Sequence, residues 1–371
     1  MTDMKESLDE KMMARALALA KLGMGFVSPN PMVGCVIVKK GKMIAEGYHQ
    51  RYGAPHAEVD ALNKIRNQKS EIRNQTMYVN MEPCCHNNKK TPPCVPAIIA
   101  SGIKRVVIGM KDPNPLVAGK GVRALRKAGI EVITDVLVRQ CKELNEAFTK
   151  WITTGKPFVV LKVAVTLDGA LTLKKGTASH LTCPESDARV HELRQYYDAI
   201  AVGVNTVVVD DPWLTVRRGL LPKGERFVES PIRNPVRVIF DTHLRIPETA
   251  RLFREKGRTI IFVGEKNKKQ LTNNKIQVVA LPLDRRGHVS LSAAFEWLGQ
   301  HGIASVLVEG GAEVARAVIE DKLADKLFFI FTPHVSADYK TPCVITPHLA
   351  RQLLTAGWES VSSDLWVKLV K

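Results

Sequence analysis

The chain has 371 residues, a length that suits two domains, and its 45% hydrophobic and 25% charged residues indicate a folded core rather than disorder. Its 54 Lys and Arg against 37 Asp and Glu leave a net charge of +17. Such a charge favours binding to nucleic acid, to an anionic surface or to a phosphorylated small molecule. The alternative is a soluble enzyme that is basic without such a partner. The seven cysteines are an odd number and favour a reducing compartment, where cysteines bind metals or pack.

The first 150 residues alternate helix and strand patterns. An amphipathic helix is expected over 8–22, which Arg15 interrupts and which does not read as a signal peptide. Two β-rich runs, 32–40 and 42–50, are joined by Lys-Gly and predict a hairpin. Further helices are predicted over 56–66, 94–101 and 119–128, and further strands over 76–82, 104–110 and 130–134. The alternation indicates an α/β sandwich with a mixed sheet, and no apolar run is long enough to cross a membrane.

A second domain is expected after a seam near residues 150–156, where a helix runs into Thr-Thr-Gly-Lys-Pro. We therefore assign residues 1–150 to one domain and 156–371 to another. Apolar strands are predicted over 158–165, 199–209, 236–242, 259–264, 276–281, 305–311 and 326–333. Such near-continuous apolar strands favour a mostly parallel sheet buried on both faces, with basic surface loops at 217–237 and 264–275.

A catalytic zinc site is predicted by one histidine, one glutamate and two cysteines of the first domain. His56 begins a predicted helix, Cys84 ends a strand, and Cys94 begins the next helix, where the helix dipole favours a thiolate. Catalytic zinc typically has three protein ligands and one open position, and it lowers the pKa of bound water to roughly 7. Glu58 would then be a proton shuttle and not a ligand. Cys85 competes with Cys84, which we prefer because it follows Glu-Pro directly. The alternative is a buried histidine with inert cysteines.

His-Ala-Glu at 56–58 followed by Pro-Cys and a second cysteine resembles the signature of the cytidine-deaminase-like zinc deaminases. The longer motifs PNPMVGCVIV, GYHQRYGAPHAE, EPCCH, KTPPC and KDPNPLVAGKG resemble the deaminase half of the bifunctional riboflavin biosynthesis family RibD. The resemblance implies deamination of 2,5-diamino-6-ribosylamino-4(3H)-pyrimidinone 5′-phosphate at its 2-amino group. It also implies that Asn30 lines the pyrimidine pocket and that His49 and Lys90 hold the ribose phosphate, with Asn114 as a further candidate. Each of these four residues could instead be an ordinary turn or solvated residue.

The second half carries a Gly-Gly pair after a buried strand, which can seat an anion or can be an ordinary turn. The motifs LKVAVTLDGALT, AIAVGVNTVVVDDPWLTVR, PVRVIFDT and LVEGGAEVARAVIEDKLADKL resemble, in order and spacing, the reductase half of the same family. The resemblance implies NADPH-dependent reduction of the ribosyl group to ribityl. The implied substrate contacts are Lys162, Arg194, Leu214, Arg217 and Glu309. The implied cofactor contacts are Ala164, Thr206, Asp210, Thr242, Gly310, Gly311 and Ala312. The arginine guanidinium suits a phosphate, although a solvated face would explain either arginine and a turn cap would explain the aspartate.

The second half departs from the family pattern at three places. Ala170 stands where a basic residue is usual. In ASHLT, Ala178 stands where the family has a serine and His180 where it has a tryptophan. HVSADYKTP replaces a glycine-rich loop. A deaminase with a degenerate reductase is therefore one alternative, and we favour an active reductase. A nucleic-acid-editing deaminase is another, which 6% aromatic residues and dispersed basic residues do not favour.

The fold expected is α/β, with an N-terminal cytidine-deaminase-like α/β/α sandwich followed by a dihydrofolate-reductase-like α/β domain. We expect a cytoplasmic homo-oligomer that uses one Zn²⁺ per chain and NADPH. Its expected partner is a phosphorylated pyrimidine substrate. We do not expect it to bind nucleic acid or a membrane.

Overall fold

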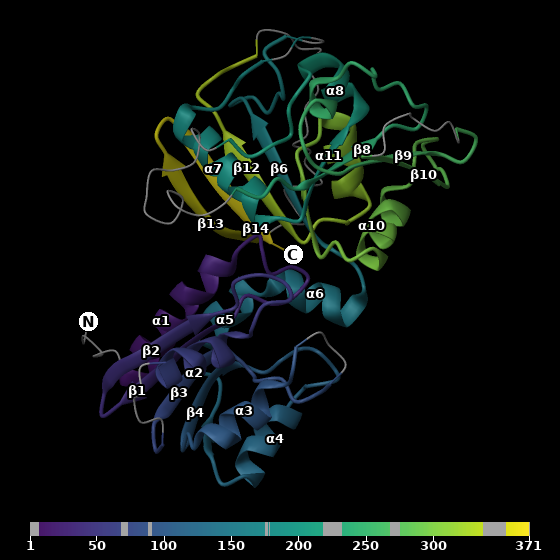
Figure 1. Ribbon diagram of the computed structural model, residues 1–371. Helices are drawn as coiled ribbons and strands as arrows, with labels where there is room; N and C mark the ends of the chain where they lie inside the picture. The colour runs from purple at the N-terminus through teal and green to yellow at the C-terminus, as the bar shows by residue number, and fades with distance from the viewer. Residues whose placement is uncertain are drawn as a thin grey trace. The chain divides into compact units, whose positions relative to one another are not determined.

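A computed structural model of the chain describes residues 7–67, 73–87, 91–174, 177, 179–217, 232–267, 275–336 and 354–370. The chain divides into two compact units, Met1–Gly155 and Lys156–Lys371 (Figure 1). Within the described ranges, every helix is too short or too polar to traverse a lipid bilayer.

Unit 1 contains a five-stranded mixed sheet in the order β2-β1-β3-β4-β5. Its strands are β1 (Gly34–Lys39), β2 (Lys42–Tyr48), β3 (Thr76–Met81), β4 (Arg105–Met110) and β5 (Glu131–Ile133). β1 is antiparallel to both β2 and β3, whereas β3, β4 and β5 are parallel. Lys40 and Gly41 close the predicted hairpin with φ values of 48° and 76°, as tight turns between twisted strands require.

Helices cover both faces of this sheet. They are α1 (Leu8–Ala20), α2 (Ala57–Asn67), α3 (Cys94–Ser101), α4 (Lys120–Lys127), α5 (Val138–Leu144) and α6 (Glu146–Thr154). The alternation along β1 explains the two layers, because Cys35 and Ile37 enter the core that contains α2 and α3, while Val36 and Val38 enter the core that contains α1. The predicted α/β/α sandwich is thereby confirmed. The first helix ends at Ala20, and a 3₁₀ turn (Lys21–Gly23) completes the predicted segment.

Unit 2 contains a nine-stranded sheet in the order β10-β9-β8-β7-β11-β6-β12-β14-β13. Its strands are β6 (Phe158–Val165), β7 (Ala199–Gly203), β8 (Val236–Phe240), β9 (Thr259–Gly264), β10 (Ile276–Leu281), β11 (Ser305–Val308), β12 (Lys326–Phe331), β13 (Leu354–Val361) and β14 (Asp364–Val370). All pairs from β10 to β12 are parallel, as predicted. The sequence did not predict the β13–β14 hairpin, whose strand β14 pairs antiparallel with β12.

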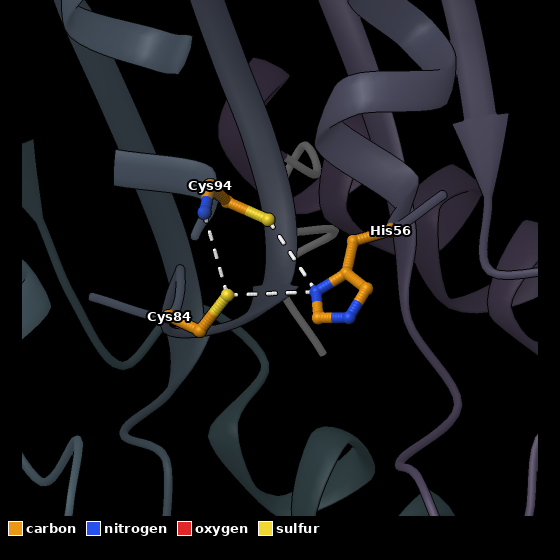
Figure 2. Close-up of side chains that lie close together, drawn as sticks. All are labelled: His56, Cys84 and Cys94. Atoms are coloured by element: carbon orange, nitrogen blue, oxygen red, sulfur yellow. Dashed lines mark hydrogen bonds between the residues drawn. The ribbon is translucent and has the colours of Figure 1, made fainter. Parts of the chain in front are cut away.

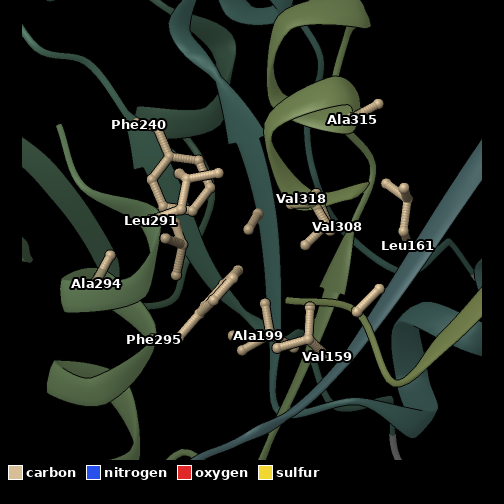
Figure 3. Packing of buried hydrophobic residues seen from close by; sticks show 14 of the residues in the cluster. Val159, Leu161, Ala199, Phe240, Leu291, Ala294, Phe295, Val308, Ala315 and Val318 are labelled. Carbon is tan, nitrogen blue, oxygen red and sulfur yellow. The ribbon is translucent and has the colours of Figure 1, made fainter. Parts of the chain in front are cut away.

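The helices of unit 2 include α7 (Pro184–Tyr196), α8 (Val204–Asp210), α10 (Leu291–Gln300) and α11 (Ala312–Glu320). On one face of the sheet, α10 and α11 contribute Phe295 and Val318 to a core that includes Val159, Phe240 and Val308 from the strands (Figure 3). Because both faces of the central strands are buried, their apolar runs are nearly continuous.

Two local predictions for unit 2 were wrong. The run 199–209 was predicted as one strand, but β7 ends at Gly203 and α8 follows, because Val204 and Val207 meet the core at a helical spacing. The surface loop predicted over 217–237 extends too far, since it overlaps the strand predicted over 236–242, and the structure places Val236 and Arg237 in β8, where Arg237 is 2% exposed. Residues 218–231 and 268–274 lie outside the described ranges.

Candidate active sites

Three potential metal ligands converge in unit 1. His56 Nδ1 lies 3.5 Å from Cys84 Sγ and 3.4 Å from Cys94 Sγ, and the three atoms all lie within 4.8 Å of one another. Figure 2 shows the imidazole and both sulfurs pointing toward one another. Both cysteines are buried. In the part of the chain that the structure describes, no other group of three or more His, Cys, Asp and Glu side chains is placed to hold a metal ion.

Strand and helix ends bring these ligands together. His56 caps α2, since its carbonyl accepts the first helical bond, from the N–H of Asp60 at 2.9 Å. Cys84 follows β3, and Cys94 is the first residue of α3. The N–H of Cys94 donates to Cys84 Sγ at 3.4 Å and to the Cys84 carbonyl at 3.1 Å. The positive end of α3 therefore faces Cys84 and favours its thiolate. Cys85, the competing candidate, does not belong to the cluster.

Glu58 lies in the first turn of α2 as a buried carboxyl next to the cluster. Only 3% of this residue is exposed, and its Oε2 has no hydrogen-bond partner among the described residues. Burial raises the pKa of Glu58 above its ordinary value, Cys84 raises it further, and His56 opposes the shift. A carboxyl with a vacant acceptor and a raised pKa can both take up and release a proton.

Three hydrogen bonds fix the two imidazoles near the cluster. His56 Nε2 lies 3.0 Å from Thr91 Oγ1, which leaves Nδ1 to face the sulfurs. His49 is 2% exposed, and its Nδ1 lies 3.0 Å from the Pro55 carbonyl oxygen. A carbonyl only accepts, so Nδ1 carries the proton and Nε2 accepts from Asn30 Nδ2 at 3.0 Å. Because both nitrogens of His49 are engaged, its contact with a ribose phosphate stays a prediction.

A cavity of about 560 Å³ adjoins this cluster. Its lining includes the predicted residues Asn30, His49, His56, Glu58, Cys84 and Asn114. Trp151 and Phe148 supply apolar surface at the same cavity. Such a concave site, with one titratable carboxyl and a few polar groups, suits a small polar ring. Lys90, predicted to hold the phosphate, lies outside the described residues.

Two neighbouring cavities occupy unit 2. One, of about 550 Å³, gathers the predicted cofactor contacts Thr206, Thr242, Gly311 and Ala312. The other, of about 570 Å³, gathers the predicted substrate contacts Lys162, Arg194, Leu214, Arg217 and Glu309, together with Asp210. Thr206, Gly311 and Ala312 line both cavities, so a ligand in one would lie next to a ligand in the other.

Two of the predicted cofactor contacts line neither cavity. Gly310 packs closely, since a Cβ there would lie 2.7 Å from Val314 Cβ. Ala164 lies on β6 and packs against a core cluster that includes Ile330. The cofactor contacts of Gly310 and Ala164 stay predictions.

A buried ionic network forms the wall of the second cavity. Arg194 donates to both carboxylate oxygens of Glu309, at 2.7 and 3.0 Å, and Lys162 Nζ lies 2.9 Å from Glu309 Oε2. Burial alone would raise the pKa of Glu309, but the Arg194 guanidinium and the Lys162 ammonium hold it well below its ordinary range. Arg194 already has a bidentate partner, so a phosphate would have to use its remaining N–H groups. Its substrate contact stays a prediction.

His191 is a residue of this cavity that sequence reasoning missed. Its Nδ1 accepts the backbone N–H of Arg217 at 3.2 Å. Burial, with Arg194 and Arg217 nearby, lowers the pKa of His191 to about 4, so the imidazole is neutral near pH 7. Leu214, in the same wall, is buried and has a φ of 52°, an uncommon backbone conformation for a leucine.

Among the family departures that fall on described residues, His180 lines the second cavity. Ala170 is 3% exposed, and its N–H donates to Thr166 Oγ1 at 2.9 Å in a closed turn. His180 Nε2 lies 2.9 Å from Asp187 Oδ2, and both side chains line the cavity. Ala178 and residues 337–342 of the HVSADYKTP segment lie outside the described ranges.

Comparisons with known proteins cover both units. Residues 6–110 match the family described as "Cytidine and deoxycytidylate deaminase zinc-binding region", and residues 157–367 match "RibD C-terminal domain". The chain is 40% identical over 338 residues to the riboflavin biosynthesis protein RibD of Aquifex aeolicus (strain VF5), covering 90% of each chain. The chain belongs to the RibD family. RibD of Escherichia coli (strain K12) is 37% identical over 91% of each chain.

A solved structure shows that this RibD family member is also similar in fold to a known protein. The diaminohydroxyphosphoribosylaminopyrimidine deaminase/5-amino-6-(5-phosphoribosylamino)uracil reductase of Thermotoga maritima gives a TM-score of 0.86 at 36% identity, covering 98% of both chains. As a RibD family member the chain is a bifunctional enzyme of riboflavin biosynthesis with a deaminase domain and a reductase domain. The expected fold of each half, cytidine-deaminase-like and then reductase-like, is confirmed.

Sequence reasoning missed several polar residues of this RibD family member. Thr91, which contacts His56, stands in the KTPPC motif and could have been found there. Glu82, in the EPCCH motif, is buried and bonded to three backbone N–H groups. His191 lies three residues before Arg194 and carried no sequence signal by itself.

Proposed function

We propose that residues 1–150 form a zinc-dependent deaminase domain and residues 156–371 an NADPH-dependent reductase domain. The first would hydrolyse the 2-amino group of 2,5-diamino-6-ribosylamino-4(3H)-pyrimidinone 5′-phosphate, and the second would reduce the ribosyl group of the product to ribityl. The observation that carries the proposal is the convergence of one imidazole and two sulfurs beside the buried carboxyl of Glu58.

The donor set of the cluster fits zinc. Tetrahedral zinc with Zn–S near 2.3 Å and Zn–N near 2.0 Å separates its sulfur and nitrogen ligands by about 3.5 Å. The two corresponding separations, 3.5 Å for Cys84 and 3.4 Å for Cys94 from His56 Nδ1, agree with that value. Zinc held by His56, Cys84 and Cys94 would keep one position open and make water a nucleophile near neutral pH.

Glu58 would move the protons of the deamination. Its Oε2, which has no hydrogen-bond partner among the described residues, can accept the proton of the attacking water, and its raised pKa favours delivery of that proton to the ring nitrogen and the leaving ammonia. His49 would fix the amide of Asn30, because Nε2 accepts from Asn30 Nδ2 and leaves Oδ1 as an acceptor for a substrate N–H. Lys90 and Asn114 remain candidates for the phosphate end.

The reductase pocket would hold NADPH and substrate in the two adjoining cavities of unit 2. NADPH bound there supplies the reducing equivalents. The N-terminus of α11 at Gly311 has no side-chain cap, and Arg245 and Arg316 line the same cavity, which suits the cofactor's phosphates. Thr206, Thr242 and Ala312 would also contact the cofactor, whereas Lys162, Arg217 and Glu309 would contact the substrate. A cytoplasmic, homo-oligomeric state stays a prediction from the sequence.

One coupled assay tests the proposal, with ammonia release and NADPH oxidation followed on the same phosphorylated pyrimidine. Glu58→Gln should retain zinc by elemental analysis and stop ammonia release, because an amide cannot carry the proton. The same variant should still oxidise NADPH when it is given the deaminated intermediate. Ammonia release within a few-fold of the wild-type rate would show that the shuttle is misassigned.

A further inference from the structure

Glu82 is a buried carboxylate between β3 and the predicted zinc ligand Cys84. It is 3% exposed, and it accepts three backbone hydrogen bonds from one distant segment. Its Oε2 accepts from the N–H of Asp112 at 3.2 Å and of Gly119 at 2.9 Å, and its Oε1 accepts from the N–H of Val122 at 3.0 Å. Charge-assisted bonds of this kind are about twice as strong as neutral ones, so the contact ties the two segments firmly.

The helix α4 needs this carboxylate because its own cap lacks a side chain. The first N–H groups of a helix have no partner within the helix, and Ser, Thr, Asp or Asn at the cap usually accepts one of them. The cap of α4 is Gly119, which makes no side-chain cap bond. Glu82 takes over this role from another part of the chain, and its negative charge faces the positive end of α4.

The N-terminal end of α4 also packs closely against the backbone that leads into Cys84. A Cβ added at Gly121 would lie 2.2 Å from the Pro83 carbonyl oxygen and 3.1 Å from Glu82 Oε1. Only glycine fits such a close approach. The position of α4 is therefore coupled directly to the backbone that carries Cys84.

The segment that Glu82 holds also forms part of the cavity wall. Asp112 Oδ1 accepts the N–H of Asn114 at 2.8 Å, and Asn114 Oδ1 accepts the N–H of Leu116 at 3.0 Å. Glu82, Asp112 and Asn114 all line the cavity of about 560 Å³ that adjoins His56. One carboxylate thus joins the backbone next to a metal ligand to the loop that limits the space for substrate.

We propose that Glu82 is a positioning residue of the deaminase site, which sets the place of Cys84 through the end of β3 and the place of Asn114 through residues 112–119. Three backbone N–H groups occupy its oxygens, so it acts through these neighbours rather than on the substrate. This role rests on the proposed deaminase function, and its test has a readout that does not depend on turnover.

Glu82→Gln keeps the shape of the side chain but replaces one acceptor oxygen by an NH₂ group. That group must face either Val122 N–H or the N–H groups of Asp112 and Gly119, so at least one bond is lost and two donors meet. Changes in groups that orient metal ligands typically reduce affinity or activity by about 10–100-fold. We expect a loss of that size in kcat/KM for deamination and in zinc affinity, measured by competition with a chelator. The thiolate-to-cobalt absorption of the Co²⁺-substituted protein should shift.

Asp9→Asn is the matched control. Asp9 accepts from Arg105 and Tyr78 in the same unit, lines no part of the cavity, and also joins separate elements through a charged network. It should lower the stability of unit 1 while leaving the cobalt spectrum and the deaminase kcat/KM within twofold. Glu82→Asp keeps both acceptor oxygens on a shorter arm, should fall between Glu82→Gln and wild type, and serves as the test if Glu82→Gln does not fold.

The role of Glu82 is refuted if its glutamine variant matches wild type in cobalt spectrum and kcat/KM, or if Asp9→Asn changes both equally. It is also refuted if Glu82→Asp, used in its place, matches wild type. A wild-type protein that releases no ammonia from the phosphorylated pyrimidine would contradict the proposed function instead. In that case the cobalt spectrum and chelator competition would still report on Glu82.

Discussion

Glu309→Gln removes one negative charge from the wall of the reductase cavity without changing its shape. Glu309 is the shared partner of Arg194 and Lys162, and the three side chains are 7%, 16% and 14% exposed. Breaking a buried ion pair by removing one partner costs about 3–5 kcal/mol, since the remaining charge stays buried without compensation. Here two cations lose the same carboxylate, so we expect unit 2 to lose about 3–5 kcal/mol of its free energy of unfolding.

Differential scanning calorimetry at neutral pH measures this loss in the unfolding transition of unit 2. Domains of about 150–250 residues lose roughly 2–4 °C of Tm per kcal/mol, so a decrease of about 10 °C is expected. The pKa of Glu309 is lowered in the folded state, so its stabilisation is present above the unfolded pKa of about 4.3 and is lost as pH falls. The difference in Tm between the Glu309→Gln variant and the wild type should therefore become smaller as pH falls below about 4.

Glu296→Gln provides the control, because Glu296 pairs with Lys156 in the same unit at 2.7 Å but both side chains are about half exposed, at 48% and 52%. Exposed pairs contribute about 0–1 kcal/mol, so its Tm should change little. A decrease for Glu309→Gln no larger than that for Glu296→Gln would refute the reasoning.

Two further predictions concern zinc and pH. Cys94→Ser should lose most of its zinc by elemental analysis and lower the Tm of unit 1, whereas Cys85→Ser should retain the metal; unchanged zinc in the Cys94 variant would point to another ligand. The pKa of His191 is about 4 in the folded state against an ordinary value of 6.5, because the folded site disfavours the protonated imidazole. Protonation therefore favours the unfolded state, and up to about 3 kcal/mol of the free energy of unfolding should be lost as pH falls from 6.5 to 4. His191→Gln should remove this pH dependence from denaturant unfolding of unit 2, and an unchanged slope would contradict the assignment.

The convergence of His56, Cys84 and Cys94 could be predicted from the sequence because each of them stands near the end of a helix or strand with its own local pattern. His56 follows Pro55 at a helix start, and Cys94 follows two prolines at another. Their supporting contacts depend on chain crossings that no local pattern encodes. Glu82 meets Gly119 and Val122, which belong to a different element.

The reductase half was less predictable for the same reason. Arginine at 194 suggested a phosphate contact, but its bidentate partner Glu309 lies 115 residues away in the sequence. The valines of α8 suggested a strand, because β-branched residues favour strands until tertiary packing overrides them. The antiparallel pairing of β14 with β12 also joins distant segments, and the alternation along β14 alone did not reveal it.

The place of β6 in its sheet has a consequence for how the chain folds during synthesis. β6 is the first strand of unit 2 to be made, but its neighbours in the sheet are β11 and β12; Figure 1 labels β12 beside β6. The apolar strand β6 is therefore synthesised long before its two neighbours, β11 and β12. High contact order slows folding and prolongs exposure of unpaired edges. During synthesis β6 therefore stays unpaired for longer than β1, β3 and β4 of the deaminase half, each of which pairs with the next strand made or the one before it.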